Sequence, residues 1–100
     1  MFALVVRFDL VDEQAAAGFD ALVADLLPQI AAHEPGTLSY VVHTVVDAPL
    51  SRLFYECYRD RAAFDEHERQ PHTRHFLDAR EAVLADRRVE FLTPYGSAAR

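Results

Sequence analysis

The chain has 100 residues, of which 51% are hydrophobic and 26% are charged. This length and composition are typical of one folded domain and exclude an intrinsically disordered chain. The formal net charge of −6, with ten basic residues that are all arginine and scattered, excludes a nucleic-acid partner, because such binding depends on clustered Lys and Arg.

No run of roughly 18 apolar residues is present, so no membrane-spanning segment is expected. The first ten residues, MFALVVRFDL, lack a basic region and carry Arg7 and Asp9, which is not typical of a signal peptide. The single cysteine, Cys57, cannot form an internal disulfide, which fits a reducing compartment. We therefore expect a cytoplasmic protein.

The first half of the chain predicts a strand followed by a long helix. Residues 2–10 (FALVVRFDL) are rich in Val and Phe and too short for a typical helix, which favours a strand. Asp12 is a candidate N-cap for a helix that the sequence Glu34-Pro35-Gly36 ends. Apolar residues recur at helical spacing between these points, at Ala15, Phe19, Leu22, Leu26 and Ile30.

The middle of the chain predicts a β-hairpin and then a short helix. Residues 37–46 and 52–60 are both β-rich, and residues 47–51 between them are turn-forming. Asp60 is a candidate N-cap for a short helix that Pro71 interrupts.

A second helical stretch is expected at about 72–86, and residues 89–95 (VEFLTPY) predict the closing strand. One side of this helix would carry Phe76, Leu77, Arg80, Val83 and Leu84. Residues 1–95 then form a single domain, and residues 96–100 a flexible C-terminal tail.

The element order β–α–β–β–α–β predicts an α+β fold of the ferredoxin-like, split βαβ type. Its four-stranded antiparallel sheet would be covered by helices on one face. The strands carry apolar side chains at both alternating positions, such as Leu4 and Val6 on one face and Ala3 and Val5 on the other. The second face should therefore also be covered, and a second copy of the chain is the expected cover, which predicts a homodimer.

Four short motifs occur together and in order along the chain. They are the loop and strand EPGTLSY (34–40), the strand FYECYRD (54–60), the pair Ala63-Phe64 leading to His67, and the pair Pro71-His72 leading to Phe76. With these motifs the chain resembles the antibiotic-biosynthesis-monooxygenase-like family of the dimeric α/β-barrel superfamily. One departure is Tyr58, at a position where the family most often has Trp.

The resemblance implies a homodimer whose sheets close into a barrel, with a pocket between sheet and helices in each subunit. Members of this family oxygenate polycyclic aromatic or quinol substrates without flavin or metal. Others degrade haem or isomerise small phosphorylated sugars, so the resemblance narrows the fold more than the substrate.

Three histidines, His67, His72 and His75, lie within nine positions of the chain. The segment from His67 to His72 is one residue too long for the zinc motif HExxH, and Pro71 interrupts it. His72 and His75 would need a third ligand, such as His67 or Glu56. No metal site is therefore expected.

Haem degradation is disfavoured by two positions. By the resemblance, the axial histidine of haem-degrading relatives falls near Leu77, and their asparagine on the first strand falls near Val6. Both haem determinants are therefore missing.

Acid–base chemistry is the remaining interpretation of the histidines. His67 follows Phe64 by one helical turn, so it should point inward and find a polar partner in Tyr40, Glu56 or Tyr58. The alternative is that His67 only satisfies the Glu56 carboxylate and packs. Glu56 itself could be a general base with a raised pKa, or an ion-pair partner of an arginine such as Arg7 or Arg52.

We expect a cofactor-independent monooxygenase that oxidises a phenol or quinol with O₂. His67, and after it Glu56, are the candidate catalytic bases. Substrate-binding residues would be Tyr40, Tyr58, Phe64 and Phe76 around the rings, with His72 holding an oxygen substituent. No glycine-rich dinucleotide loop suggests a flavin or nicotinamide cofactor.

Two other functions remain open at this point. The first is an isomerase of a small polar metabolite, whose anionic substrate would require Arg7, Arg52 or Arg74 in the pocket. The second is a dimeric protein that binds a small molecule without catalysis.

Overall fold

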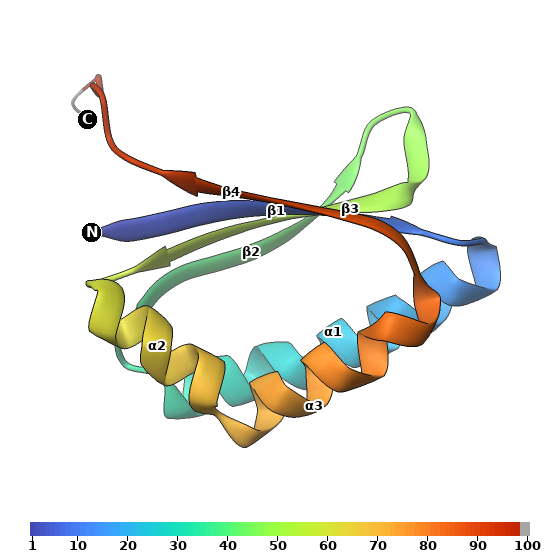
Figure 1. Cartoon of the computed structure of the whole chain (residues 1–100), viewed down its shortest axis with the longest axis horizontal. Coiled ribbons are helices and arrows are strands. Elements are labelled where there is room, and N and C mark those ends of the chain that lie inside the picture. The colour runs from blue at the N-terminus through green and yellow to red at the C-terminus, as the bar shows by residue number, and fades with distance from the viewer. Residues whose placement is uncertain (99–100) are drawn as a thin grey trace.

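The computed structural model describes residues 1–98 and places four strands in one antiparallel sheet of order β2-β3-β1-β4. The elements are β1 (Phe2–Leu10), α1 (Glu13–His33), β2 (Thr37–Val45), β3 (Ala48–Tyr58), α2 (Arg61–Arg69), α3 (Pro71–Arg80), a 3₁₀ turn (Glu81–Val83) and β4 (Leu84–Leu92). All helices lie on one face of the sheet, which is the layer arrangement of Figure 1. The predicted α+β, ferredoxin-like fold is confirmed.

The helices begin where the capping residues predict. The Asp12 carboxylate accepts a hydrogen bond from the backbone N–H of Ala15 at 2.7 Å, and Asp60 accepts one from Ala63 at 2.8 Å. Each bond satisfies an amide that the first helical turn leaves without an internal partner. Pro71 is the first residue of α3, where its missing N–H costs nothing.

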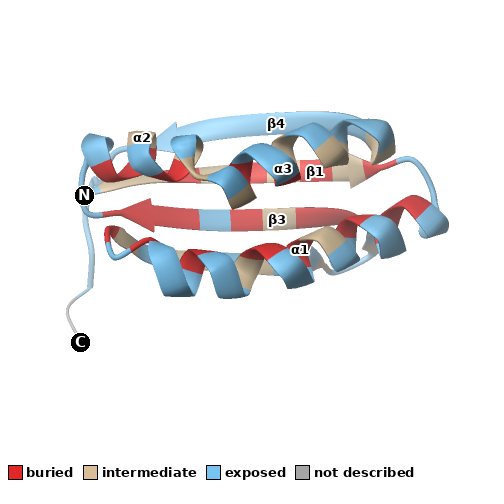
Figure 2. Cartoon of the chain, turned by 90° about the horizontal axis from the view of Figure 1, so that it is seen from below, coloured by how far each residue is buried: buried red, intermediate tan, exposed pale blue. Residues whose placement is uncertain are grey.

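An aromatic cluster joins the sheet to the helices. Phe8 on β1 contacts Phe19 on α1, and Phe54 on β3 contacts both Phe19 and Phe76 on α3, with ring centroids 5.2–6.1 Å apart. Figure 2 shows buried residues on β1 and β3, alternating with less buried ones, and stripes of buried residues on the helices. Each aromatic pair of this cluster adds roughly 0.5–1.5 kcal/mol of stability beyond that from burial of its apolar area.

The C-terminal elements differ from the prediction. The helix expected at 72–86 ends at Arg80, and the strand expected at 89–95 is β4, Leu84–Leu92. β4 pairs with β1 from Leu10↔Leu84 to Ala3↔Leu92, so ladder hydrogen bonds override the helical spacing of residues 81–86. β4 is an edge strand and is largely exposed, so its sequence, LADRRVEFL, is rich in charged residues. It therefore lacks the apolar pattern by which a strand is predicted from sequence.

The hairpin turn is also shorter than the expected segment 47–51. β3 already begins at Ala48, which pairs with Val45 and leaves only Val46 and Asp47 in the turn. Asp47 adopts a positive φ of 62°, a conformation that Asp tolerates better than most residues.

Helix α1 is long and apolar enough to cross a membrane when judged by length and composition alone. Its buried residues, among them Phe19, Leu26 and Ile30, pack against the sheet as part of the core. It therefore behaves as the core helix of a folded domain. Of the expected tail 96–100, residues 99 and 100 lie outside the described residues, and its flexibility stays a prediction.

The sheet face opposite the helices carries a row of apolar side chains beside charged residues such as Arg7 and Asp9, and no element within residues 1–98 covers it (Figure 1). Tyr55 at its centre pairs with Val5 on one side and Val41 on the other, so the three side chains form a row across β1, β3 and β2. Val41 and Tyr55 remain 44% and 38% exposed, respectively. A second copy packed on this face would bury the row.

We predict that Val41→Asp reduces self-association, because it places a charge in the proposed interface at a site that is exposed in the single chain. Light scattering should give twice the 11.3 kDa chain mass for the wild type at micromolar concentration and a lower mass for the variant. Val46→Asp, in the hairpin turn, is the matched control and should remain dimeric. A wild-type mass equal to one chain contradicts the prediction.

Candidate functional site

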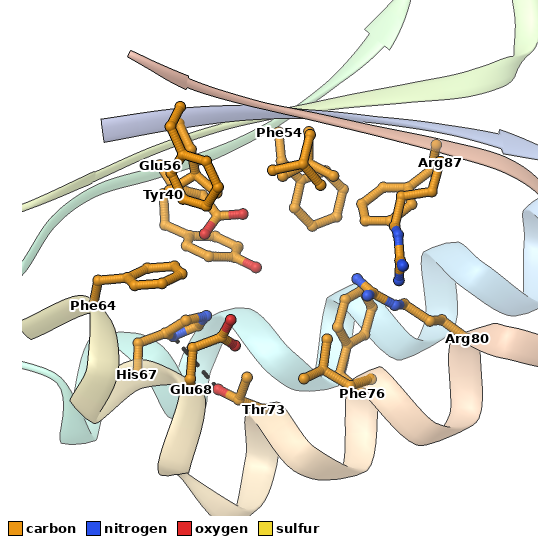
Figure 3. A pocket seen from close by; sticks show the side chains of 16 residues that line it. Tyr40, Phe54, Glu56, Phe64, His67, Glu68, Thr73, Phe76, Arg80 and Arg87 are labelled. Carbon is orange, nitrogen blue, oxygen red and sulfur yellow. Dashed lines mark hydrogen bonds between the residues drawn. The ribbon is translucent and has the colours of Figure 1, made fainter. Parts of the chain in front are cut away.

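A cavity of about 340 Å³ lies between the helix-facing side of the sheet and helices α2 and α3 (Figure 3). This size is within the usual range for small-molecule sites. Six aromatic side chains form much of its wall: Phe8, Tyr40, Phe54, Phe64, Phe76 and Phe91. Aliphatic residues complete the apolar surface: Leu4, Val6, Leu77 and Val89. Its polar and charged residues are Glu56, His67, Glu68, Thr73, Arg80 and Arg87.

His67 on α2 is buried and held by a carboxylate. Its Nδ1 lies 2.7 Å from Oε1 of Glu34, which follows α1. Since an ionised carboxylate only accepts, Nδ1 carries the hydrogen and donates it. In the neutral ring this leaves Nε2 as an acceptor, and Figure 3 shows the ring at the cavity wall between Phe64 and Thr73. The pair therefore fixes both the orientation and the tautomer of the imidazole.

Glu34 accepts hydrogen bonds from three side chains. Its second oxygen, Oε2, accepts a short hydrogen bond from Nε2 of His72, and Oε1 also accepts one from the Thr37 hydroxyl at 2.7 Å. Burial by itself would raise the pKa of Glu34, but the hydrogen bonds from His67, His72 and Thr37 outweigh it and hold the pKa below its usual value near 4.5. Glu34 is thus a buried carboxylate that stays ionised at neutral pH.

Gly36 allows the loop that carries Glu34 to approach α2. A Cβ at position 36 would come within 2.7 Å of the Ala63 Cβ, closer than atoms can pack. The Gly36 carbonyl also accepts a hydrogen bond from the Arg59 N–H at 2.9 Å, which ties the loop to the end of β3. The glycine is therefore needed to place the carboxylate beside His67.

A second buried carboxylate, Glu56 on β3, faces the cavity near His67 (Figure 3). The Tyr58 hydroxyl donates to its Oε1 at 2.6 Å. Burial raises the pKa of Glu56 above its usual value, and burial together with the Glu56 charge raises the pKa values of Tyr40 and Tyr58. Both tyrosines therefore keep their hydroxyl protons at neutral pH.

Two arginines occupy the other end of the cavity. Arg80, the last residue of α3, and Arg87 on β4 extend toward each other there (Figure 3). The Arg80 guanidinium lies over the ring of Phe8 at 5.0 Å and near that of Phe76 at 5.7 Å. Its buried Nε has no hydrogen-bond partner within the described residues.

Five of the seven site residues predicted from the sequence line this cavity: Tyr40, Glu56, Phe64, His67 and Phe76. Tyr58 and His72 do not. Tyr58 is fully buried with its hydroxyl on Glu56, and His72 directs Nε2 to Glu34 instead of to a substrate oxygen. The partner expected for His67 among Tyr40, Glu56 and Tyr58 is in fact Glu34.

The arginines named from the sequence are elsewhere. Arg7 contacts Asp9 and Ser51 on the open sheet face, Arg52 pairs with Asp20, and Arg74 is exposed. The arginines in the cavity, Arg80 and Arg87, were missed as site residues, although the spacing from Phe76 to Arg80 places Arg80 on the inner face of α3.

Neither metal nor haem ligands stand out at this site. Within residues 1–98 no group of three His, Cys, Asp or Glu side chains is arranged to hold a metal ion. Val6 and Leu77, at the two positions that the resemblance associates with haem binding, present aliphatic side chains to the cavity.

A family model matches most of the chain. The model of the family described as antibiotic biosynthesis monooxygenase matches residues 1–79. No curated protein matches the chain significantly.

Solved structures extend the similarity over the whole fold. The chain is similar to Rv0793 from Mycobacterium tuberculosis, with 26% identity, a TM-score of 0.86 and 98% of each chain covered. It is similar to SO0527 from Shewanella oneidensis, with 26% identity and a TM-score of 0.81, over 91% of this chain and 87% of that one. A structure described as an antibiotic biosynthesis monooxygenase is 23% identical, with a TM-score of 0.84, over 96% of this chain and 100% of that one.

We predict that Glu34→Gln destabilises the protein by about 1–3 kcal/mol at neutral pH, because it removes the ionised acceptor of one buried and two partly buried hydrogen bonds. The folded-state pKa of Glu34 is below its unfolded value near 4.5, so the carboxylate stabilises the fold fully above about pH 4.5 and loses this effect as the pH falls through the folded-state pKa.

Denaturant unfolding over a pH series checks this prediction. The difference in unfolding free energy between wild type and Glu34→Gln should shrink as the solution is acidified. Glu66→Gln, which removes an exposed carboxylate on α2, is the control and should change stability little. A difference that is independent of pH contradicts the assignment.

Proposed function

The chain belongs to the antibiotic biosynthesis monooxygenase family, and from this premise we propose that it is a cofactor-independent monooxygenase of phenols or quinols. The observation that carries the proposal is a carboxylate-bound histidine at the wall of an aromatic-lined cavity. This arrangement can bind a flat aromatic molecule and remove a proton from it. Similarity to known structures supports a monooxygenase-like function, and the substrate class is our inference from the cavity.

His67 is the proposed base. Glu34 holds the Nδ1 hydrogen, so Nε2 accepts the phenolic proton of the substrate. The imidazolium that forms is stabilised by the Glu34 carboxylate, whose low pKa keeps it charged throughout. Glu34 does not touch the substrate and is a positioning residue.

The substrate anion can supply all the electrons that the reaction needs. It transfers one electron to O₂, and the resulting phenoxyl radical and superoxide combine at a ring carbon that carries hydrogen. The peroxide then loses water, for which His67 returns its proton, and the ring becomes a quinone. One atom of O₂ ends in the quinone and the other in water, so the overall conversion of phenol and O₂ to quinone and water balances without an external reductant.

The other cavity residues bind and orient the substrate in this proposal. The rings of Phe54, Phe64 and Phe76 would pack against its aromatic skeleton, and the Tyr40 hydroxyl would donate a hydrogen bond to a substrate oxygen. Glu56 is the second candidate base, because its buried carboxyl faces the same space. The proposed assembly is a homodimer formed through the open sheet face.

Two alternative functions can be distinguished from a monooxygenase by experiment. An isomerase of a polar metabolite would use the same base but consume no O₂, and a binding protein would hold an aromatic ligand without converting it. An oxygen electrode and isotope-labelled O₂ identify a monooxygenase, and chromatographic separation before mass analysis distinguishes an isomer of equal mass from unconverted ligand. Incorporation of one labelled oxygen atom per product molecule is the result expected here.

We predict that His67→Ala lowers turnover of a phenol by roughly 10²–10⁴-fold while the protein stays folded, which is the usual range for loss of an acid–base group. Oxygen uptake and the melting temperature should be measured on the same preparation. Unchanged turnover per folded molecule, with a lower melting temperature, would show that His67 is only structural.

Two further variants make this test specific. His75→Ala removes an exposed histidine of α3 and should leave turnover unchanged. Glu56→Gln identifies the base: a loss of activity larger than that of His67→Ala would transfer the role of base to Glu56.

A further inference from the structure

The arginine end of the cavity has a charge that the fold itself does not neutralise. The Arg80 side chain is 11% exposed, and its Nε is buried without a hydrogen-bond partner in the part of the chain that the structure describes. Burial, and after it the neighbouring charge of Arg87, lower the pKa of Arg80, yet a guanidinium remains protonated in proteins. A buried charge of this kind is costly unless something pairs with it.

Glu81 forms only long ion pairs with the two arginines, without a hydrogen bond. Glu81 lies 4.0 Å from Arg80 Nε and 3.6 Å from Arg87 Nη1, beyond hydrogen-bonding distance in both cases, and its side chain is 64% exposed. Two guanidinium groups therefore share one solvated carboxylate. Glu56 and Glu68 line the other part of the cavity, beside His67 (Figure 3).

The two guanidinium groups come from different elements and meet at the cavity. Arg80 is fixed by its contacts over Phe8 and Phe76, whereas Arg87 is about half exposed and reaches down from β4. Guanidinium N–H groups arranged in this way match the two oxygens of a carboxylate, which accepts paired hydrogen bonds.

The arginines are well separated from the proposed base. Thr73, whose hydroxyl is 3.4 Å from His67 Nδ1, and Arg80 are two helical turns apart on α3, or about 10 Å along the helix axis. The space between is lined by Phe54 and Phe76. An aromatic skeleton can span this distance with its reacting hydroxyl at one end and a second group at the other.

We propose that Arg80 and Arg87 bind a carboxylate of the substrate, which makes the substrate class a phenolic aromatic acid. The chemical step in this inference rests on the proposed monooxygenase function, but recognition of the acid does not. The carboxylate would accept the hydrogen bond that Arg80 Nε lacks, and its charge would orient the phenolic oxygen toward His67.

Binding of two matched probes tests the inference. Calorimetry with a hydroxynaphthoate and with the corresponding uncharged hydroxynaphthamide should give about 10-fold or tighter binding for the acid, in keeping with the strength of charged hydrogen bonds. The Arg80 Nε–H signal in nitrogen-correlated NMR spectra, assigned by its loss in Arg80→Gln, should shift on addition of the acid and not of the amide.

Charge-matched variants identify the groups responsible. Arg80→Gln and Arg87→Gln should each reduce the preference for the acid, whereas Arg74→Gln, which removes an exposed charge from the same helix, should leave it unchanged. Arg80→Gln also removes the contacts of Arg80 with the rings of Phe8 and Phe76. Arg87→Gln leaves these contacts intact, and Arg80→Lys keeps a positive charge near the rings.

The outcomes separate this inference from the proposed function. Equal affinity for the two probes, an equal effect of Arg74→Gln, or no saturable binding of the acid at millimolar concentration overturns the carboxylate site. A clear preference for the acid without any oxygen uptake supports the carboxylate site and contradicts the monooxygenase proposal instead.

Discussion

The buried Glu34 carboxylate is the interaction on which the arrangement of the site depends. It accepts hydrogen bonds from His67 on α2, from His72 at the start of α3 and from Thr37 on β2, and so joins three elements at one point. Because these bonds outweigh the cost of burial, the carboxylate stays ionised. A change in its charge would therefore alter the position of both helices as well as the hydrogen-bonding state of the proposed base.

The cavity is asymmetric in charge and continuous in its apolar walls. Glu56 and His67 lie toward one end and the two arginines at the other, with aromatic rings from sheet and helices between them. A ligand that is apolar in the middle and polar at both ends would satisfy every group that faces this space. Water in the cavity could hydrate the charged groups, but it would also contact the aromatic rings, which is unfavourable. An amphiphilic aromatic ligand would cover the rings and is therefore favoured over a small polar one.

The two faces of the sheet have different roles because strand residues alternate between them. Along β3, Phe54, Glu56 and Tyr58 point to the helices, and the first two line the cavity, whereas Leu53 and Tyr55 point to the open face. A solved structure that is only 18% identical to this chain has the same fold, with a TM-score of 0.88, so the arrangement of sheet and helices tolerates wide changes of sequence. A shared fold does not by itself identify a substrate.

The sequence by itself determined the local features of this protein. Asp12 and Asp60 predicted the helix starts, and the spacing of Phe64 and His67 predicted that the histidine points inward, because capping and helical periodicity involve only nearby residues. The element order followed from the same rules, and together with the family resemblance they predicted seven site residues, of which five line the cavity.

Only the tertiary structure decided which distant groups meet. Glu34 and His67 are 33 positions apart, and the loop held by Gly36, whose signal was interpreted only as a helix end, brings them together. Arg80 and Arg87 converge because β4 begins earlier than its polar sequence suggests and pairs along the whole of β1. Local propensity cannot specify such contacts, since they arise from the packing of complete elements.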